Sequence, residues 1–358
     1  MFTPLPSLVG GCLLSYSTST LLLSQGRVLG CSGVSHATVA GVVLPETPNN
    51  NFSHAWKWSA TAGLLVGGLI LRVLRPNLEA WVGASIFDDQ PLLRIADVGL
   101  AKVLLAGVLV GAGTKLANGC TSGHMLVGLA RQSKRSLVAV LTFFSAALVT
   151  ATQFAPLPPA ILAAQSSAAI AKPYTVDLYD AAPPLLASAI LLAPVLSSLP
   201  GVTYSLPVPK RFKPAAQSFL LGITFSLGLA FAGMTRPSKV LGFFYLPGLA
   251  PAGAPQWDPS LMMVALGGLI PNWFAWNKVA NVWKKPIVAD KWECPSTTAP
   301  VDAKLVLGSL MFGVGWGMMG ICPGPLLAVL GAGPAIAGSA LFAFAGAYAC
   351  GGLLARPF

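Results

Sequence analysis

Apolar stretches long enough to cross a lipid bilayer recur along this sequence and leave few folds open to it. About nine of them are present, at residues 5–23, 57–74, 97–117, 135–152, 181–199, 215–232, 260–276, 303–320 and 333–353. A transmembrane helix needs about 20 apolar residues. Only 9% of the residues are charged, whereas soluble proteins carry about 25%. We therefore expect an all-α polytopic membrane protein with about nine transmembrane helices.

Four shorter apolar pieces, at 36–44, 124–130, 240–250 and 323–331, each follow a break rich in glycine or proline. Irregular backbone at membrane depth is tolerated only where it is buried in protein or lines a cavity. The pattern favours about four short re-entrant half-helices whose broken ends point at something polar. Surface loops or interfacial helices are the alternative interpretation.

The sequence also contains an internal repeat. Residues 101–130 align without gaps with residues 303–332, so that Cys120 falls on Cys322. A weaker echo pairs GRVLGCSG at 26–33 with SKVLGFF at 238–244. Duplicated halves with broken helices are typical of secondary transporters, whose substrate sites form where the broken helices meet.

These patterns predict a single membrane domain over 1–358 with two pseudo-symmetric repeats. The repeats are expected at about 5–152 and 215–353, joined by a connecting segment at about 153–214. Whether they run parallel or inverted is left open by the sequence.

The net charge of +11 has two interpretations. Lysine and arginine gather in cytoplasmic loops of membrane proteins, and they also bias a vestibule toward anions. No long basic run with interleaved aromatic residues occurs, so nucleic acid is not expected as a partner.

Two of the six cysteines, Cys120 and Cys322, lie where a helix is expected to break, at equivalent places in the repeat. Thr121 or Ser122 is expected to cap the half-helix after the first break, and Pro323 suits the first turn after the second. Backbone N–H groups at such helix starts attract anions. A thiol adds a weak S–H donor and a polarizable sulfur, which suits a soft anion that must pass without sticking.

The opposing interpretation treats each cysteine as a small apolar filler. Cys31 follows the first Val-Leu-Gly element and is a third candidate. The residues expected to support the pathway flank these breaks: Gly119, Thr121, Ser122, Gly123, His124, Pro323, Gly324, Arg236 and Lys239. His124 has two open roles, as a donor to an anion or as a cap on a carbonyl. Arg236 and Lys239 are expected to add positive potential.

The segments at these breaks resemble a known family. NGCTSGHMLVGLARQSKRSLVAVLTFF at 118–144 and FGVGWGMMGICPGPLLAVLGAG at 312–333 are similar to the two signatures of the YeeE/YedE sulfur-transport family. GRVLGCSGV at 26–34 and GMTRPSKVLGFF at 233–244 are similar to its two minor motifs. Asn118 stands where a glycine is common in the family motif. The sequon at Asn51 and an insertion at 45–56 suggest a fungal member.

The resemblance implies spanning helices plus short helices that dip to the membrane centre. It implies uptake of thiosulfate or a related sulfur anion, handed along by cysteine S–H hydrogen bonds. The motif cysteines of the family fall on Cys120 and Cys322, and its N-terminal cysteine falls on Cys31.

We therefore expect a transporter in the plasma membrane, not an enzyme, that needs no cofactor and no metal. The lipid bilayer and a sulfur anion are its expected partners, together with a cytosolic protein that accepts sulfur. Two alternatives stay open. A membrane sulfurtransferase would carry sulfur as a persulfide on an activated thiolate, and a scaffold without a pathway would tolerate loss of the cysteines.

Overall fold

The computed structural model describes residues 2–44, 55–82, 84–88, 98–154, 209–250, 254 and 257–356, and the elements within them are helical. The long helices are α1 (Pro4–Gln25), α3 (Ala55–Val73), α6 (Leu100–Leu116), α7 (Lys134–Val149), α10 (Lys213–Phe231), α12 (Ser260–Val282), α13 (Ala303–Met319) and α15 (Pro334–Leu354). The short ones are α2 (Cys31–Val43), α4 (Arg75–Val82), η4 (Thr121–Leu129), η5 (Thr150–Phe154), η6 (Lys210–Phe212), α11 (Pro237–Phe244) and α14 (Pro323–Gly331). The expected all-α class is confirmed.

By length and composition, five helices in the described residues can cross a membrane. They span Pro4–Gln25, Leu100–Leu129, Lys134–Phe154, Lys210–Phe231 and Pro334–Leu354. The pair α13 and α14, bent by 44°, makes a sixth if it counts as one span. The expected stretch 181–199 and most of the connecting segment lie outside the described residues, so the count of nine stays a prediction.

The exposed surface of the long helices is suited to contact with lipid. Large apolar side chains face outward, as at Leu141 (60% exposed) and Phe274 (63% exposed). Hydroxyl side chains lie inside, as at Ser15 and Thr18, which are fully buried. Large apolar side chains exposed along several long helices are typical of a surface that contacts lipid or another apolar partner.

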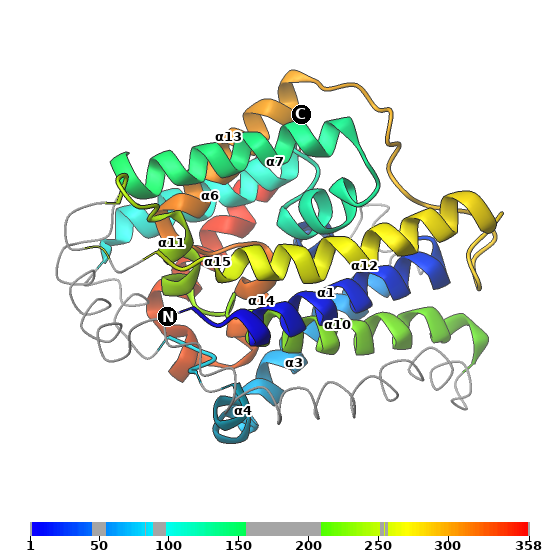
Figure 1. Cartoon of the computed structure of the whole chain (residues 1–358), viewed down its shortest axis with the longest axis horizontal. Helices are drawn as coiled ribbons and strands as arrows, with labels where there is room; N and C mark the ends of the chain where they lie inside the picture. The colour runs from blue at the N-terminus through cyan, green and yellow to red at the C-terminus, as the bar shows by residue number, and fades with distance from the viewer. Residues whose placement is uncertain are drawn as a thin grey trace.

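Contacts at the start and at the end of helix α1 define the two ends of the molecule. It packs between α10 and α12, and the three lie side by side in Figure 1. The Thr3 backbone N–H donates to Ser260 Oγ at 3.0 Å, at the start of α12. At the other end, the Ile287 N–H, beyond the end of α12, donates to the Leu23 carbonyl at 3.0 Å. A helix of 22 residues is about 33 Å long, which is enough to cross the hydrocarbon core.

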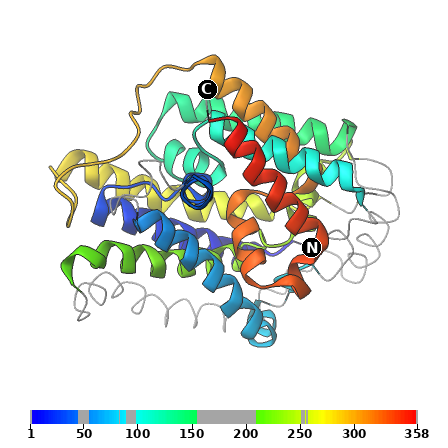
Figure 2. The same ribbon diagram turned by 180° about the vertical axis from the view of Figure 1, so that it is seen from behind.

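Small residues allow α6 and α13 to pack closely and antiparallel, while α15 covers the other side of α6 (Figure 2). A Cβ atom on Gly113 would lie 2.7 Å from the Gly308 carbonyl oxygen, and one on Gly315 would lie 2.7 Å from the Ala106 carbonyl oxygen. In the ungapped alignment, Gly113 corresponds to Gly315 and Ala106 to Gly308. The contact between the two helices is therefore reciprocal, as contacts across a two-fold axis are.

The weaker Val-Leu-Gly echo does not mark equivalent places in the fold. Residues 28–30 lie in the connection between α1 and α2, whereas residues 240–242 lie inside α11. The backbone instead relates Gly26 and Gly233, which both have φ of 70° and follow the ends of α1 and α10. The expected match was wrong because three small or apolar residues suit a loop and a helix alike.

Candidate functional site

Three half-helices begin at three cysteines. Cys31 is the first residue of α2, Cys120 is the N-cap of η4, and Cys322 is the N-cap of α14. The expected short pieces at 36–44, 124–130 and 323–331 fall on these elements. The fourth, expected at 240–250, falls only in part on α11, which ends at Phe244.

The same three cysteines line one small cavity of 20 Å³ in the described part of the protein. Cys31, Cys120 and Cys322 are 1%, 1% and 3% exposed. The remaining lining is apolar except for Thr121 and Ser122. This volume holds little more than one water molecule, so little free space surrounds the thiols.

Thr121 and Ser122 join the three cysteines to one another. Ser122 Oγ accepts a hydrogen bond from the Cys31 backbone N–H at 3.0 Å and contacts Cys120 Sγ at 3.3 Å. Thr121 Oγ1 donates to Cys322 Sγ at 3.8 Å. The expectation that Thr121 or Ser122 caps η4 was wrong. Cys120 takes the N-cap position without a side-chain cap, and this leaves both hydroxyls free to face the other half-helices.

The first turn of α14 brings its backbone against Cys31. Pro323 stands in the first turn, as expected. A Cβ atom on Gly324 would lie 3.0 Å from Cys31 Sγ, which is tighter than an ordinary van der Waals contact. The absence of a side chain at Gly324 therefore sets the distance between α14 and this thiol.

His124 acts as a carbonyl cap in this structure. Its imidazole hydrogen-bonds to the Ala117 carbonyl oxygen and to Ser136 Oγ, both at 3.1 Å. A Cβ atom on Gly119 would lie 2.7 Å from His124 Nε2, so a side chain there would displace the imidazole. Asn118 has a left-handed backbone with φ of 55°, which glycine and asparagine adopt most readily.

A larger cavity of 480 Å³, here called the vestibule, reaches these breaks from one end of the molecule. Its lining includes Gly30 and Gly119, the neighbours of Cys31 and Cys120, as well as Gly123 and His124. Four basic side chains also line it: Arg27, Lys57, Arg131 and Arg135. Glu293 is the acidic residue in this lining, and it pairs with Arg27 at 2.8 Å.

Arg131 is held firmly at the vestibule. It is 7% exposed, its guanidinium lies 4.5 Å from the ring centre of Trp276, and it donates to the Pro295 carbonyl oxygen. Its buried Nε has no hydrogen-bond partner among the described residues. A buried cation with an unused donor gives the vestibule a positive wall that suits an anion.

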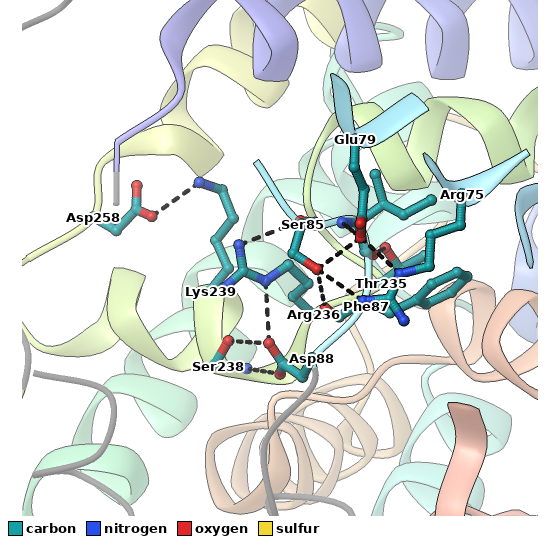
Figure 3. A network of polar contacts seen from close by, with 11 residues as sticks. Arg75, Glu79, Ser85, Phe87, Asp88, Thr235, Arg236, Ser238, Lys239 and Asp258 are labelled. Atoms are coloured by element: carbon teal, nitrogen blue, oxygen red, sulfur yellow. Dashed lines mark hydrogen bonds and ion pairs between the residues drawn. The ribbon is translucent and has the colours of Figure 1, made fainter. Parts of the chain in front are cut away.

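Arg236 and Lys239 do not supply the free positive potential expected of them. Arg236 Nε pairs with Asp88 at 3.1 Å, and Lys239 Nζ pairs with Asp258 at 3.0 Å (Figure 3). Each cation is thus neutralised by a carboxylate that the sequence patterns did not single out. The pairing of Arg236 with Asp88 joins residues 148 positions apart, and such a pairing leaves no local signal.

His36 is a buried polar residue that connects three helices. It lies on α2, its ring stacks on Tyr348 with centres 4.8 Å apart, and Nε2 contacts Thr114 Oγ1 at 3.0 Å. Tyr348 also hydrogen-bonds to Ser35 at 2.6 Å. This cluster fastens α2 to α6 and α15.

The other three cysteines lie away from the cavity. Cys12 and Cys350 are exposed on the helices α1 and α15. Cys294 is half-buried in the loop after α12 and donates to the Gly26 carbonyl oxygen at 3.3 Å. No group of three metal-ligating side chains occurs in the part of the chain that the structure describes.

Comparison with known proteins relates this chain to bacterial transporters. A probable transporter of Xylella fastidiosa strain Temecula1 is 37% identical over 145 residues, which cover 40% of this chain and 90% of the relative. A probable transporter of strain 9a5c is 35% identical over the same share of each chain. Residues 215–355 match a family described as "Family of unknown function (DUF6691)".

These relatives are therefore less than half as long as this chain. They are bacterial, so they lend no support to the expectation of a fungal member.

Proposed function

The chain belongs to the same family as the Xylella fastidiosa probable transporters, and from this premise we propose that it imports thiosulfate or a related small sulfur anion. It is an integral membrane protein, and we place it in the plasma membrane. The finer part of the proposal rests on the cysteine site and on the resemblance of its motifs to the YeeE/YedE sulfur-transport family.

One observation carries the proposal: three cysteines from distant parts of the chain start three half-helices and line one cavity. A single buried cysteine needs no function. Three that converge at the ends of broken helices match the placement of substrate sites in secondary transporters.

The chemistry of this cavity suits passage of an anion better than its storage. Each thiol offers one weak S–H donor, and the half-helix starts offer backbone N–H groups. The lining contains no charged side chain, so an oxyanion would meet several weak donors and no strong counter-charge. It would be passed from thiol to thiol, since conduction needs binding that is weak enough to release.

The vestibule fits the cytoplasmic end of this pathway. Its basic lining lies at the end of α1 that is followed by Arg27. Three more basic residues lie at this end: Lys115 in the last turn of α6, Lys213 at the start of α10 and Arg356 after α15. Basic residues gather on the cytoplasmic side. An anion that leaves the thiols would enter this basic vestibule on its way to the cytoplasm.

The reciprocal contact of α6 with α13 supports two repeats of inverted orientation, at about 5–152 and 215–353. The two helices are antiparallel and meet through equivalent residues. An inverted pair places Cys120 and Cys322 on facing half-helices at the same depth, where one anion can contact both.

The test is uptake of radiolabelled thiosulfate into cells that lack other sulfur importers. Cys31→Ala, Cys120→Ala and Cys322→Ala are each expected to lower uptake by about 10-fold or more, because a hydrogen bond to a charged group contributes about 1.5–3 kcal/mol. Cys350→Ala, on the exposed face of α15, is the matched control.

Wild-type uptake no greater than that of empty cells would overturn the thiosulfate assignment. A trapped persulfide on one of the three cysteines would favour the sulfurtransferase. That reaction needs an activated thiolate. The half-helix starts supply part of this activation, but the cavity lining contains no cation.

A further inference from the structure

The polar cluster around Arg236 lies at the end of the molecule opposite the vestibule. Asp258 accepts hydrogen bonds from the backbone N–H and the hydroxyl of Ser260, which itself contacts Thr3 at the start of α1. Arg27, in the vestibule wall, follows the other end of the same helix. The cluster and the vestibule are therefore separated by about the length of α1.

This cluster also covers the cysteine cavity. Met234, two residues before Arg236, lines the cavity. A Cβ atom on Gly320 would lie 2.6 Å from the Pro237 carbonyl oxygen, so the start of α11 rests on the break that leads to Cys322. The start of α11 therefore lies beside both the cysteine cavity and the break before Cys322.

The short segment 84–88 crosses that start and is fastened to it. Asp88 accepts from Arg236 Nε at 3.1 Å and from the Ser238 backbone N–H at 2.9 Å, and also from the Ser238 hydroxyl (Figure 3). The Ser85 carbonyl oxygen accepts from Arg236 at 3.3 Å. The Asp88 carboxylate is the charged group of this segment, and its side chain is only 3% exposed.

The same segment is tied on its other side to α4. Glu79 Oε1 accepts from the Ile86 backbone N–H at 3.0 Å and from the Ser85 hydroxyl at 2.8 Å, and it pairs with Arg75 at 2.8 Å (Figure 3). Segment 84–88 thus stays attached to α4 if its contacts with α11 break.

The two ion pairs of the cluster differ in how easily an anion can reach them. Lys239 and Asp258 are 3% and 4% exposed, and Asp258 also accepts from the first backbone N–H of α12, so this pair is fixed in the core. Arg236 is 26% exposed. Its guanidinium, together with the N–H and hydroxyl of Ser238, is a donor set that binds oxyanions well.

We propose that Asp88 is the outer gate of the pathway: its carboxylate holds segment 84–88 against Arg236 and Ser238, and an incoming oxyanion opens the mouth by competing for these donors. The structure then has its vestibule accessible and its outer mouth shut. This inference rests on the proposed transport function for the identity of the anion, but the closed contact itself does not depend on it.

The gate is tested by the reactivity of the central thiols. Cys12, Cys294 and Cys350 are first replaced by serine, so that Cys31, Cys120 and Cys322 are the thiols that remain. Intact cells then receive a membrane-impermeant methanethiosulfonate, and the rate at which it labels these thiols is measured. Asp88→Asn, which keeps the shape of the side chain, is expected to raise this rate about 10-fold or more, because a charge-assisted contact is lost. Ser238→Ala, a milder change, should give a smaller rise.

Asp290→Asn is the matched control, because it removes the same charge from an exposed loop after α12. Thiosulfate should speed labelling of the wild type and should have no effect on Asp88→Asn, whereas chloride should affect neither. Labelling of Asp88→Asn and Ser238→Ala at the wild-type rate would overturn the gate. Faster labelling of both in a protein that takes up no thiosulfate would keep the gate and reject the thiosulfate assignment.

Discussion

Replacing Ser122 with alanine removes the link between two of the cysteine half-helices. The Ser122 hydroxyl is the acceptor for the buried Cys31 N–H at 3.0 Å and the partner of Cys120 Sγ at 3.3 Å. Both cysteines are 1% exposed, so water does not replace the lost acceptor. A buried donor without a partner costs about 1–3 kcal/mol, and the free energy of unfolding should fall by that amount.

Transport should fall with stability, because the orphaned N–H starts the half-helix that carries Cys31. The purified protein is heated in detergent and the monodisperse fraction is measured by size exclusion, alongside thiosulfate uptake in cells at matched expression. Ser122→Ala should lower the midpoint by a few degrees and should also lower uptake, because the half-helix that carries Cys31 loses the contact that positions its start. Thr121→Val keeps the side-chain size and loses only the 3.8 Å contact with Cys322 Sγ, so its midpoint should stay near that of the wild type. A wild-type midpoint and wild-type uptake for Ser122→Ala would refute the proposed link.

Two further predictions concern the helix contacts. Gly113→Ala and Gly315→Ala should each lower stability by about 1–3 kcal/mol, because their Cβ atoms would lie 2.4 Å and 2.7 Å from backbone atoms of the facing helix. Gly346→Ala has nothing within 4 Å and should be neutral or stabilising, and equal melting of all three variants would contradict the close contact of α6 with α13. Asp302 accepts from the Leu305 backbone N–H at 2.8 Å, and this bond and Arg135 hold the pKa of its carboxyl below the usual range. Its folded pKa lies below its unfolded one, so its stabilisation is present at neutral pH and is lost as the pH falls through the folded pKa. Melting curves of the wild type and Asp302→Ala should therefore differ at pH 7 and converge below about pH 4, and a constant difference would argue against a charged cap.

The positions of the three half-helix starts were readable from the sequence because each carries a local signal. A glycine or proline break beside a cysteine marks Cys31, Cys120 and Cys322 in the linear chain. Which of these breaks meet in space depends on helix packing, and the ungapped repeat predicted that for two of them. The cysteines lie together as the sequence suggested, while their roles in transport stay a proposal.

The charged partners were not readable, because each depends on a distant side chain. Asp88 meets Arg236 across 148 positions, and Asp258 meets Lys239 through the fold of the chain after α11. His36 likewise lies buried against Tyr348, 312 positions away in the sequence. The same limit explains the error at Thr121 and Ser122: the Thr121 hydroxyl contacts Cys322, and the Ser122 hydroxyl contacts Cys31 as well as Cys120.

The two ends of the proposed pathway differ, although the two proposed repeats would make them equivalent. An inverted pair would place equivalent elements at opposite ends of the pathway, so α2 and α11 should correspond. However, α2 begins with the thiol of Cys31, whereas α11 is preceded by Arg236 and begins with residues that hold Asp88. Relatives less than half as long as this chain would need two copies or two chains to build such a centre. In the proposed arrangement the two ends of the pathway differ: one has the basic vestibule, and the other has the Asp88–Arg236 pair that we propose as the gate.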